Sequence, residues 1–488
     1  MKDKKIEQLA VDAAASMRGN RSADAIAAHI RLLKADPNRP DDWYNLGYLQ
    51  KRSRMFDEAL SSYSEALDRN VSGPEEVYLN RAVILTDALR RPEKAADELL
   101  KALAVKADYV PALLNLGNLH EDRGARDEAR ECYSKALAAQ PGNALALMRV
   151  AEVSQIVSAD DPLVGELRSA ITRQGNESMD RADIGFALGR LLDSVGAYDD
   201  AFAAYDNANI ASRQAGGLQY SPAATKAMID QLIDAFDDTG LGGGNASDKA
   251  GDKAGDSPIF ICGMFRSGST LAERILAAHS GIVAGGELDL IPALVAQQLN
   301  PYPASVASAN FSELRATYLS GLAQMDLKPA FLTDKRPDNF LHIGLIKRIF
   351  PSAKIIHTTR NPLDNCLSAF FAHLDPRMTY AQNLDCAADW YRQYQRLMQH
   401  WKRLYPDDIF DLSYDSVVHD PGPQIAEILD FLGLDWEDAC LEPHSVTGVV
   451  RTASSWQVRE PLYQRSSGRH RNYSGHIESL IEAFGAPG

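Results

Sequence analysis

Hydrophobic and small residues in the first half of the chain recur with a period of about 34–36 residues. In each copy, small residues fall where two helices would cross, and an aromatic residue falls where the space between them must be filled. A helix pair of this kind cannot bury its apolar face alone, so neighbouring pairs have to stack. The pattern predicts a repeating α-helical array, an α-solenoid, over residues 1–215, with an unrelated helical bundle as the alternative. The three clearest copies consist of Trp43, Leu46, Gly47, Ala59, Tyr63 and Ala66; of Leu113, Leu116, Gly117, Ala129, Tyr133, Ala136 and Pro141; and of Leu188, Gly189, Ala201, Tyr205 and Ala208.

The composition changes over residues 216–256. A rough helical pattern at Ala223–Phe236 is followed by a run from Asp237 to Asp256 that is rich in glycine, aspartate, serine and lysine. This run has no aromatic residues, so it cannot bury enough apolar area to offset the entropy lost on ordering. The segment is therefore predicted to be a helical tail and a flexible linker.

From residue 257 onward, short apolar runs alternate with helical patterns. Such alternation predicts a central parallel sheet that is covered by helices on both faces, which is a three-layer α/β domain over residues 257–488. The fold class of the whole chain is thus α plus α/β. A ligand of such a domain is expected outside the carboxyl ends of the strands. The expected strands are Ile259–Cys262, Phe331–Thr333, Lys354–Thr358 and Ile409–Leu412.

The first expected strand leads into a turn that has the composition of a phosphate-binding loop. Gly263 to Thr270 reads G-x4-G-S-T, which is close to a Walker A loop but has serine in place of lysine. Glycines let the backbone curl so that successive N–H groups point inward, and a helix N-terminus follows. Arg266 supplies a cation, while the missing lysine argues against ordinary nucleoside triphosphate hydrolysis. Taken alone, such a loop could equally be a plain strand-to-helix turn.

A second donor-rich turn follows the third expected strand. Arg360 ends that strand, and Ser368 lies eight residues later, about two turns into a helix that starts near Asn361. Arginine binds phosphate through a planar fork, and serine adds a neutral donor. Alone, such an arginine is more often a surface ion-pair partner. Two loops of this kind together predict a ligand with phosphate at both ends, which points to the sulfate donor PAPS rather than to ATP.

These motifs carry a resemblance to two known families. The first half resembles a tetratricopeptide-repeat array. Residues 257–488 resemble a P-loop-like PAPS-dependent sulfotransferase domain, as in the tyrosylprotein sulfotransferases and the related bacterial repeat-containing sulfotransferases. That family has an R-S-G-[ST]-T loop and an arginine followed eight residues later by serine. The matching residues are Arg266–Thr270; Arg360 and Ser368; Glu287 in a G-E context 21 residues after Arg266; Lys335 in a K-x-P context; Ser454–Pro461 for a late S-[ST]-x-Q-V-x-x-P segment; Tyr414 in a Y-[DE]-x-[LV] context; and Arg469 for a later basic residue.

The resemblance implies a role for each of these residues. In sulfuryl transfer a hydroxyl attacks sulfur in line and a bisphosphate nucleotide leaves, so the site needs a base and charge-stabilising donors, and no metal is expected. Glu287 would accept the hydroxyl proton, Lys335 would contact the leaving oxygen, and Arg266 and Ser454 would stabilise the sulfuryl oxygens. Without the resemblance, Glu287 and Lys335 would read as solvated surface residues, and Tyr414 as a core residue. The expected nucleotide-binding residues are Arg266, Ser267, Gly268, Ser269, Thr270, Arg360, Ser368, Tyr414 and Arg469.

Charge and composition limit the expected partners. The net charge of -15 argues against a protein that coats nucleic acid. The five cysteines are scattered without metal-ligand spacing, which favours a reduced protein with neither a disulfide framework nor a zinc site. No run approaches the ~18 apolar residues that a membrane span needs, and the first residues lack the pattern of a secretory signal. We therefore expect a cytoplasmic protein, in contrast to the secretory tyrosylprotein enzymes.

The acceptor and the role of the repeats stay open at this point. The concave face of a repeat array commonly binds extended peptide, so the first hypothesis is a peptide or protein tyrosine that the repeats recruit, that is, protein sulfation. A small-molecule, glycan or lipid hydroxyl is the alternative within the same chemistry. Two hypotheses from other functional classes remain: a P-loop phosphotransferase and a non-enzymatic repeat scaffold.

Overall fold

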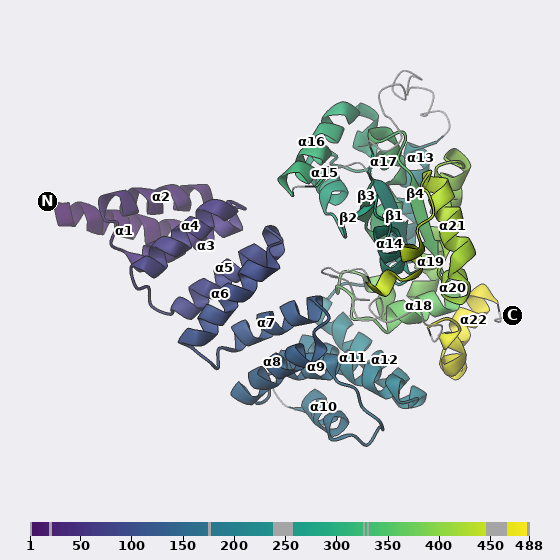
Figure 1. The fold of residues 1–488 in the computed structure, drawn as a ribbon, viewed down its shortest axis with the longest axis horizontal. Coiled ribbons are helices and arrows are strands. Elements are labelled where there is room, and N and C mark those ends of the chain that lie inside the picture. Colours follow the sequence, from purple (N-terminus) through teal and green to yellow (C-terminus); the bar gives the residue numbers. More distant parts are fainter. Residues whose placement is uncertain are drawn as a thin grey trace. The chain divides into compact units, whose positions relative to one another are not determined.

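The computed structural model describes residues 2–18, 22–173, 177–237, 257–325, 327–328, 331–445 and 466–485. The chain divides into two compact units, Met1–Ser154 and Gln155–Gly488. Figure 1 shows the fold of each unit, with helices in the first and a sheet surrounded by helices in the second.

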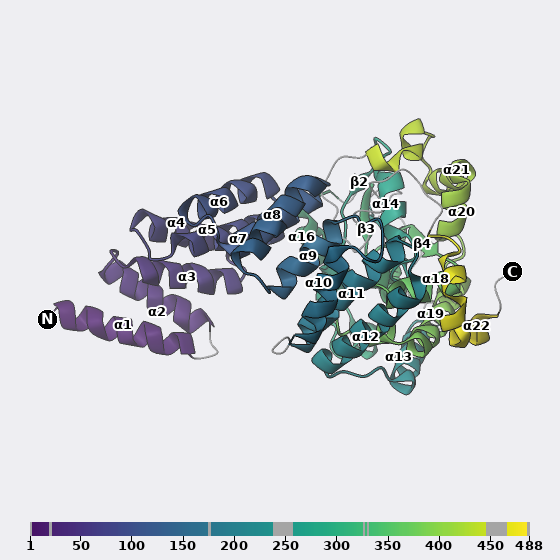
Figure 2. The ribbon, with the colours of Figure 1, turned by 90° about the horizontal axis from the view of Figure 1, so that it is seen from below.

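The described part of the first unit consists of helices that follow one another as hairpins. Figure 2 shows these helices stacked in chain order. A Cβ added at Gly47 would lie 2.8 Å from the ring of Tyr63, and one at Gly117 would lie 2.3 Å from the ring of Tyr133. The small and aromatic positions therefore meet as the repeat pattern predicts, and the helical array is confirmed. The helices are α1 (Lys2–Arg18), α2 (Ser22–Ala35), α3 (Pro40–Arg52), α4 (Phe56–Asp68), α5 (Pro74–Val83), α6 (Pro92–Val105), α7 (Val110–Asp122), α8 (Arg126–Ala139) and α9 (Ala144–Val153).

The second unit is built around a five-stranded sheet with strand order β2-β3-β1-β4-β5. Every neighbouring pair is parallel; Ile261 lies beside Lys335, and Gly263 lies beside Thr358. The four predicted strands are present, and the two-residue strand β2 is one that the apolar pattern missed. The strands are β1 (Ile259–Gly263), β2 (Val283–Ala284), β3 (Leu332–Lys335), β4 (Ile355–Thr359) and β5 (Ile409–Ser413).

Helices cover both faces of this sheet, which confirms the predicted three-layer arrangement. Ile261 and Ile356 pack into an apolar cluster with residues of α14 (Ser269–Ala277), α20 (Tyr414–His419) and α21 (Pro421–Leu432). On the other face, Phe260 contacts Tyr318 and Phe350, with ring centroids 6.2 and 6.1 Å away. The remaining helices of the domain are α15 (Leu290–Gln298), α16 (Phe311–Gln324), α17 (Ile343–Ile349), α18 (Pro362–Phe370), α19 (Leu384–Leu404) and α22 (Glu478–Phe484).

Within the described residues of the second unit, the helices that precede the sheet are α10 (Pro162–Thr172), α11 (Ser178–Ser194), α12 (Tyr198–Gly216) and α13 (Pro222–Ala235). Helices α11 and α12 keep the repeat geometry, because a Cβ at Gly189 would lie 2.7 Å from the ring of Tyr205. The boundary between the two compact units thus falls at Ser154, whereas the repeat pattern continues to about residue 215. Most of the expected linker, residues 238–256, lies outside the described residues.

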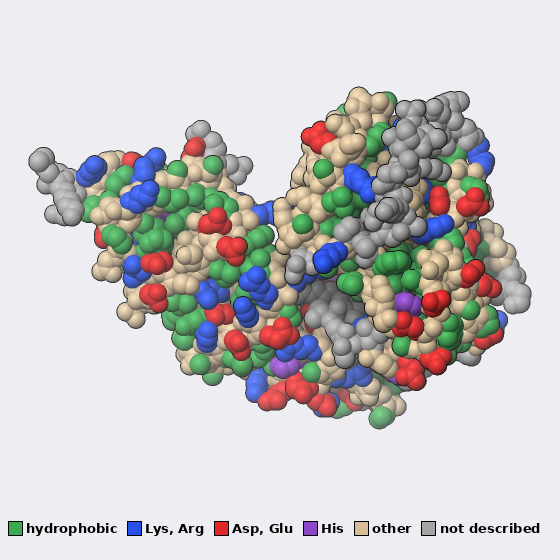
Figure 3. Space-filling model, turned by 45° about the horizontal axis from the view of Figure 1, so that its top comes forward, with side chains coloured by type: hydrophobic (Ala, Val, Ile, Leu, Met, Phe, Trp, Pro, Cys, Tyr) green, Lys and Arg blue, Asp and Glu red, His purple; other side chains and the backbone are tan. Residues whose placement is uncertain are grey.

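Charge is mixed on the surface of the first unit. Figure 3 shows acidic and basic side chains interspersed on the face that it presents, so this face offers no single-sign field to a partner. None of the helices in the described ranges is both long enough and apolar enough to cross a membrane. Within the same ranges, no cluster of three or more His, Cys, Asp or Glu side chains is placed to hold a metal ion.

Candidate active site

The first part of the site is the turn between β1 and α14. The φ angle of Gly268 is 100°, and a Cβ there would lie 2.7 Å from the ring of Tyr414, so the turn requires glycine. Arg266 also has a positive φ, 70°, a conformation that costs a non-glycine residue about 1 kcal/mol. The buried Ser267 hydroxyl lies 2.7 Å from the hydroxyl of Thr358, which fastens the turn to β4. The turn therefore presents the N-terminus of α14 at the carboxyl edge of the sheet, as the sequence predicts.

The second part of the site follows β4. Arg360 is 8% exposed, and its Nη1 donates to the backbone oxygen of Arg266 over 3.0 Å. Its guanidinium lies 4.8 Å above the ring of Tyr414. Ser368, on α18, accepts a hydrogen bond from Arg266 Nε over 3.2 Å. The structure thus brings the two predicted phosphate elements together, although Arg266 and Ser368 are separated by 102 positions in the chain.

Glu287 and Lys335 form the third part. Lys335 is the last residue of β3, and its Nζ lies 2.6 Å from Glu287 Oε1. The lysine side chain is 1% exposed and the glutamate side chain 37%, so the pair joins a buried cation to a carboxylate that solvent can reach. The backbone N–H of Lys335 also donates to Gly286 O over 3.0 Å. These contacts place the expected base and the expected leaving-group donor at the same edge of the sheet as Arg266.

Glu273, on α14, is a residue that sequence reasoning missed. Its Oε1 accepts the Gly286 N–H over 2.9 Å and the Thr333 hydroxyl over 2.7 Å. Burial raises the pKa of Glu273, although the nearby Lys335 ammonium acts in the opposite direction. This carboxyl group therefore ties the loop that carries Glu287 to the helix that follows the phosphate turn. No signal in the sequence singles it out, because its partners are separated from it by 13 and 60 positions.

We expect Glu273→Ala to lower kcat by roughly 10- to 100-fold, because a small displacement of Glu287 removes it from its reacting position. The affinity for the nucleotide should change little. Glu273→Gln keeps an oxygen acceptor for both donors, so its kcat should stay within about threefold of the wild-type value. The matched control is Glu427→Ala, which replaces an exposed glutamate on α21. Equal losses in the alanine and glutamine variants would contradict a positioning role through these hydrogen bonds.

Asp334, the neighbour of Lys335 on β3, is a buried carboxyl group beneath the site. Its Oδ2 accepts the hydroxyl of Tyr318 over 2.7 Å. Burial raises the pKa of Asp334 to about 7, while the Tyr318 hydrogen bond and the Arg336 charge act in the opposite direction. The folded state therefore binds this proton more tightly than the unfolded state, and the resulting stability is lost as the pH rises from about 4 to about 7.

The side chain of the Asp334→Asn variant cannot titrate, so this variant should not lose stability in this way as the pH rises. Between pH 5 and pH 8 we expect its free energy of unfolding to rise by about 3 kcal/mol relative to that of the wild type. Urea unfolding of both proteins at the two pH values measures this difference. Asp430→Asn, on the exposed side of α21, serves as the control. A difference between Asp334→Asn and wild type that does not depend on pH would contradict the raised pKa.

Two of the predicted site residues have no described contact with this cluster. Ser454 lies outside the described residues, together with the late segment that contains it. Arg469 is described, but its guanidinium contacts Asp193 of α11, with 2.8 Å between Nη2 and Oδ2. Its expected contact with the nucleotide stays a prediction.

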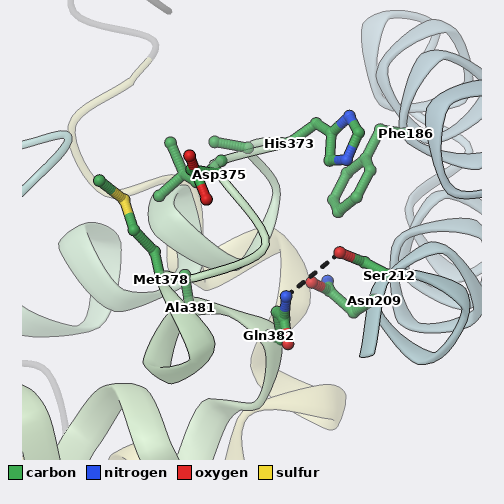
Figure 4. Close-up of a pocket in the computed structure, with 10 residues that line it drawn as sticks. Phe186, Asn209, Ser212, His373, Asp375, Met378, Ala381 and Gln382 are labelled. Carbon is green, nitrogen blue, oxygen red and sulfur yellow. Dashed lines mark hydrogen bonds between the residues drawn. The ribbon is translucent and has the colours of Figure 1, made fainter. Parts of the chain in front are cut away.

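A hollow near the far end of α18 contains none of the predicted site residues. Figure 4 shows Phe186, Asn209 and Ser212 on one side of it and the segment from His373 to Gln382 on the other. Gln382 Nε2 donates to Ser212 Oγ over 3.2 Å. The hollow therefore marks where α11 and α12 pack against the segment after α18, and it is separate from the candidate site.

The arrangement has unsatisfied hydrogen-bonding capacity at the position where the sequence predicts a phosphate. Among the described residues, Arg360 Nε is buried and has no hydrogen-bond partner. A buried donor of this kind costs free energy unless a ligand or water accepts from it. Together with the donors of the first turn, it fits a bisphosphate nucleotide such as PAPS.

Comparison with known proteins gives matches in both halves of the chain. Residues 258–438 match the sulfotransferase family, and residues 44–111 and 110–143 match tetratricopeptide repeats. An uncharacterised protein of Aquifex aeolicus (strain VF5) is 28% identical over 468 residues, covering 91% of this chain and 60% of the relative. Protein-tyrosine sulfotransferase 1 of Danio rerio is 24% identical over 222 residues, covering 42% of this chain and 61% of the relative. The chain thus spans about three fifths of the length of these relatives.

Among solved structures, the sulfotransferase domain of the Synechococcus PCC 7002 olefin synthase is 24% identical, with a TM-score of 0.35. The similarity covers 48% of this chain and 98% of that domain.

Proposed function

We propose that this chain, which joins tetratricopeptide repeats to a sulfotransferase-family domain, transfers a sulfuryl group from PAPS to a hydroxyl acceptor. The observation that carries the proposal is the meeting of Arg266, Arg360 and Ser368, together with the Glu287–Lys335 pair at the end of the neighbouring strand β3. A site of this composition has hydrogen-bond donors for two separate phosphate groups. It also has a carboxylate, that of Glu287, next to the ammonium group of Lys335.

Each residue of the site has a distinct task in this proposal. The turn from Ser267 to Thr270 holds the 5′-phosphosulfate with backbone N–H groups and hydroxyls. Arg360 and Ser368 hold the 3′-phosphate, and this contact distinguishes PAPS from ATP. Tyr414 supports both elements, because its ring touches the turn at Gly268 and lies under the guanidinium of Arg360.

The transfer itself needs one proton acceptor and one cation. PAPS supplies the sulfuryl group: the acceptor oxygen forms a bond to sulfur while the bond from sulfur to the 5′-phosphate oxygen breaks, and PAP leaves. The Glu287 carboxylate takes the proton of the acceptor hydroxyl. Lys335 donates to the leaving oxygen, and Arg266 stabilises the negative charge on the sulfuryl oxygens. The 2.6 Å contact of Lys335 with Glu287 supports this division, because it holds acid and base side by side before substrate arrives.

We further propose a tyrosine of a peptide or protein as the acceptor, which the repeats recruit. Two observations support this choice. One is the helical array of the first unit, whose pattern is common in peptide-binding proteins. The other is the similarity of about two fifths of the chain to protein-tyrosine sulfotransferases. A cytoplasmic location and a peptide or protein partner that the repeats bind belong to the same proposal.

The test is release of PAP from PAPS, with 35S-labelled donor to follow the sulfuryl group. We expect label on a tyrosine-containing peptide and none on the matched phenylalanine peptide. Label on a small phenol, a glycan or a lipid in place of the peptide would overturn the acceptor but keep the reaction. Turnover of ATP with magnesium, and none of PAPS, would favour a phosphotransferase. Capture of peptide without any nucleotide binding would favour a scaffold.

A further inference from the structure

The segment 466–470 lies against the Arg360 side of the candidate site. The backbone oxygen of Ser466 accepts a hydrogen bond from Arg360 Nη2. The backbone N–H groups of Gly468 and His470 donate to the buried carboxylate of Asp364 over 2.6 and 2.7 Å. Because Arg266 O and Ser466 O hold the two Nη atoms, the guanidinium of Arg360 has one defined orientation, with its Nε left for a ligand.

The same segment is fastened on its other side to α11. Arg469 reaches Asp193 with both Nη2 and Nε, over 2.8 and 3.3 Å. The hydroxyl of the buried Tyr473 also donates to Asp193. One carboxylate therefore satisfies two side chains from the stretch that follows Ser466.

The place of Asp193 in its helix supports a specific role. Asp193 is the next-to-last residue of α11, where a carboxylate faces the negative end of the helix dipole and is unfavourable. An acidic residue at this place gains nothing from its own helix. The two side chains that donate to its carboxylate, Arg469 and Tyr473, are 276 and 280 positions away, in the stretch that follows Ser466.

Aromatic rings pack around this contact. The ring of Phe371, just after α18, lies 4.1 Å from that of Tyr205 on α12 and 4.8 Å from that of Tyr473. The guanidinium of Arg469 lies 4.9 Å from the centroid of Phe371. The last repeat pair, α11 and α12, is thus packed into the domain that carries the site, and both lie within the second unit.

We propose that Asp193 is a positioning residue for the 3′-phosphate end of the nucleotide site, acting through Arg469 and segment 466–470 on Arg360. The proposal rests on the proposed function. Replacing the Asp193 carboxylate by an amide removes its charge and one of the two oxygens that accept from Arg469 and Tyr473. The segment is then held less firmly and has to be ordered when the nucleotide binds. Ordering of side chains and loops lowers binding affinity. Because the 3′-phosphate contacts Arg360, the loss should affect ligands that have this phosphate.

Asp193→Asn tests this coupling by titration with PAP and with AMP, two ligands that differ only in the 3′-phosphate. We expect the Kd for PAP to rise roughly tenfold, while the Kd for AMP and the kcat at saturating PAPS stay within about twofold. Asp193→Glu keeps the charge and should restore much of the affinity. The matched control is Asp230→Asn, which removes an ion pair between α13 and Arg396 of α19 that does not involve segment 466–470; its Kd for PAP should not change.

The outcomes separate this inference from the proposed function. An unchanged Kd for PAP in Asp193→Asn, or an equal loss for PAP and AMP, overturns the positioning role and leaves the sulfotransferase proposal intact. A wild-type protein that does not bind PAP overturns the proposed function. Hydrogen exchange of the Gly468 and His470 amides reports the coupling without any nucleotide: it should be faster in Asp193→Asn than in Asp230→Asn, and equal rates overturn the inference.

Discussion

Replacing Glu287 by glutamine is expected to lower kcat by about 10²–10⁴-fold, the range that a general base contributes. Glutamine has nearly the same shape but cannot take a proton from the acceptor hydroxyl. The Kd for PAP should stay within a few fold, because Glu287 contacts Lys335 and not the phosphate turns. Steady-state release of PAP from PAPS measures kcat, and calorimetry measures the binding.

The matched control for this variant is Asp289→Asn. Asp289 lies two residues later, is 87% exposed, and pairs with Arg336 over 2.6 Å. It should keep activity within about twofold, as expected for an exposed ion pair. Lys335→Ala should lose turnover to a similar extent as Glu287→Gln, because it removes the donor to the leaving oxygen. Full activity in both Glu287→Gln and Lys335→Ala would show that the transfer does not use this pair.

Replacing Arg360 by alanine is expected to weaken PAP binding about 100-fold. A buried guanidinium that makes charge-assisted hydrogen bonds to phosphate contributes roughly 1.5–3 kcal/mol for each bond. ADP has no 3′-phosphate, so its affinity should change by no more than about threefold. Arg360→Lys retains the charge without the fork and should give an intermediate Kd.

Arg377→Ala is the control for this second prediction. Arg377 is 81% exposed and pairs with the nearby Asp375, so its removal should leave the affinity for PAP unchanged. If Arg360→Ala lowers the affinities for PAP and ADP to the same degree, Arg360 does not bind the 3′-phosphate.

The local features of the fold are predictable from the sequence because each depends on residues that are close along the chain. The pairing of Gly117 with Tyr133 and the strand-to-helix turn at Gly268 follow from spacing alone. The strand β2 escaped the apolar pattern because it has only two residues, both exposed.

The candidate site likewise has residues whose meeting could be predicted from the sequence and residues whose roles could not. Arg266, Arg360 and Ser368 follow strand ends, and strand ends of a parallel sheet meet at one edge, so their meeting could be predicted. The roles suggested for Glu273 and Asp193 could not, because each depends on hydrogen bonds to residues that the fold brings together from distant positions. Arg469 shows the limit of spacing as a guide: the motif assigned it to the nucleotide, while its guanidinium contacts Asp193.

We propose that the site recognises a nucleotide with phosphate at both the 3′ and 5′ positions. The most direct measurement is calorimetric titration of the full-length protein with PAP, ADP and ATP, each without and with magnesium. We expect tight binding of PAP, with ADP and ATP weaker by about 100-fold, which is the contribution expected of the Arg360 contact. Equal affinity for the three nucleotides, or no binding of PAP, would contradict it.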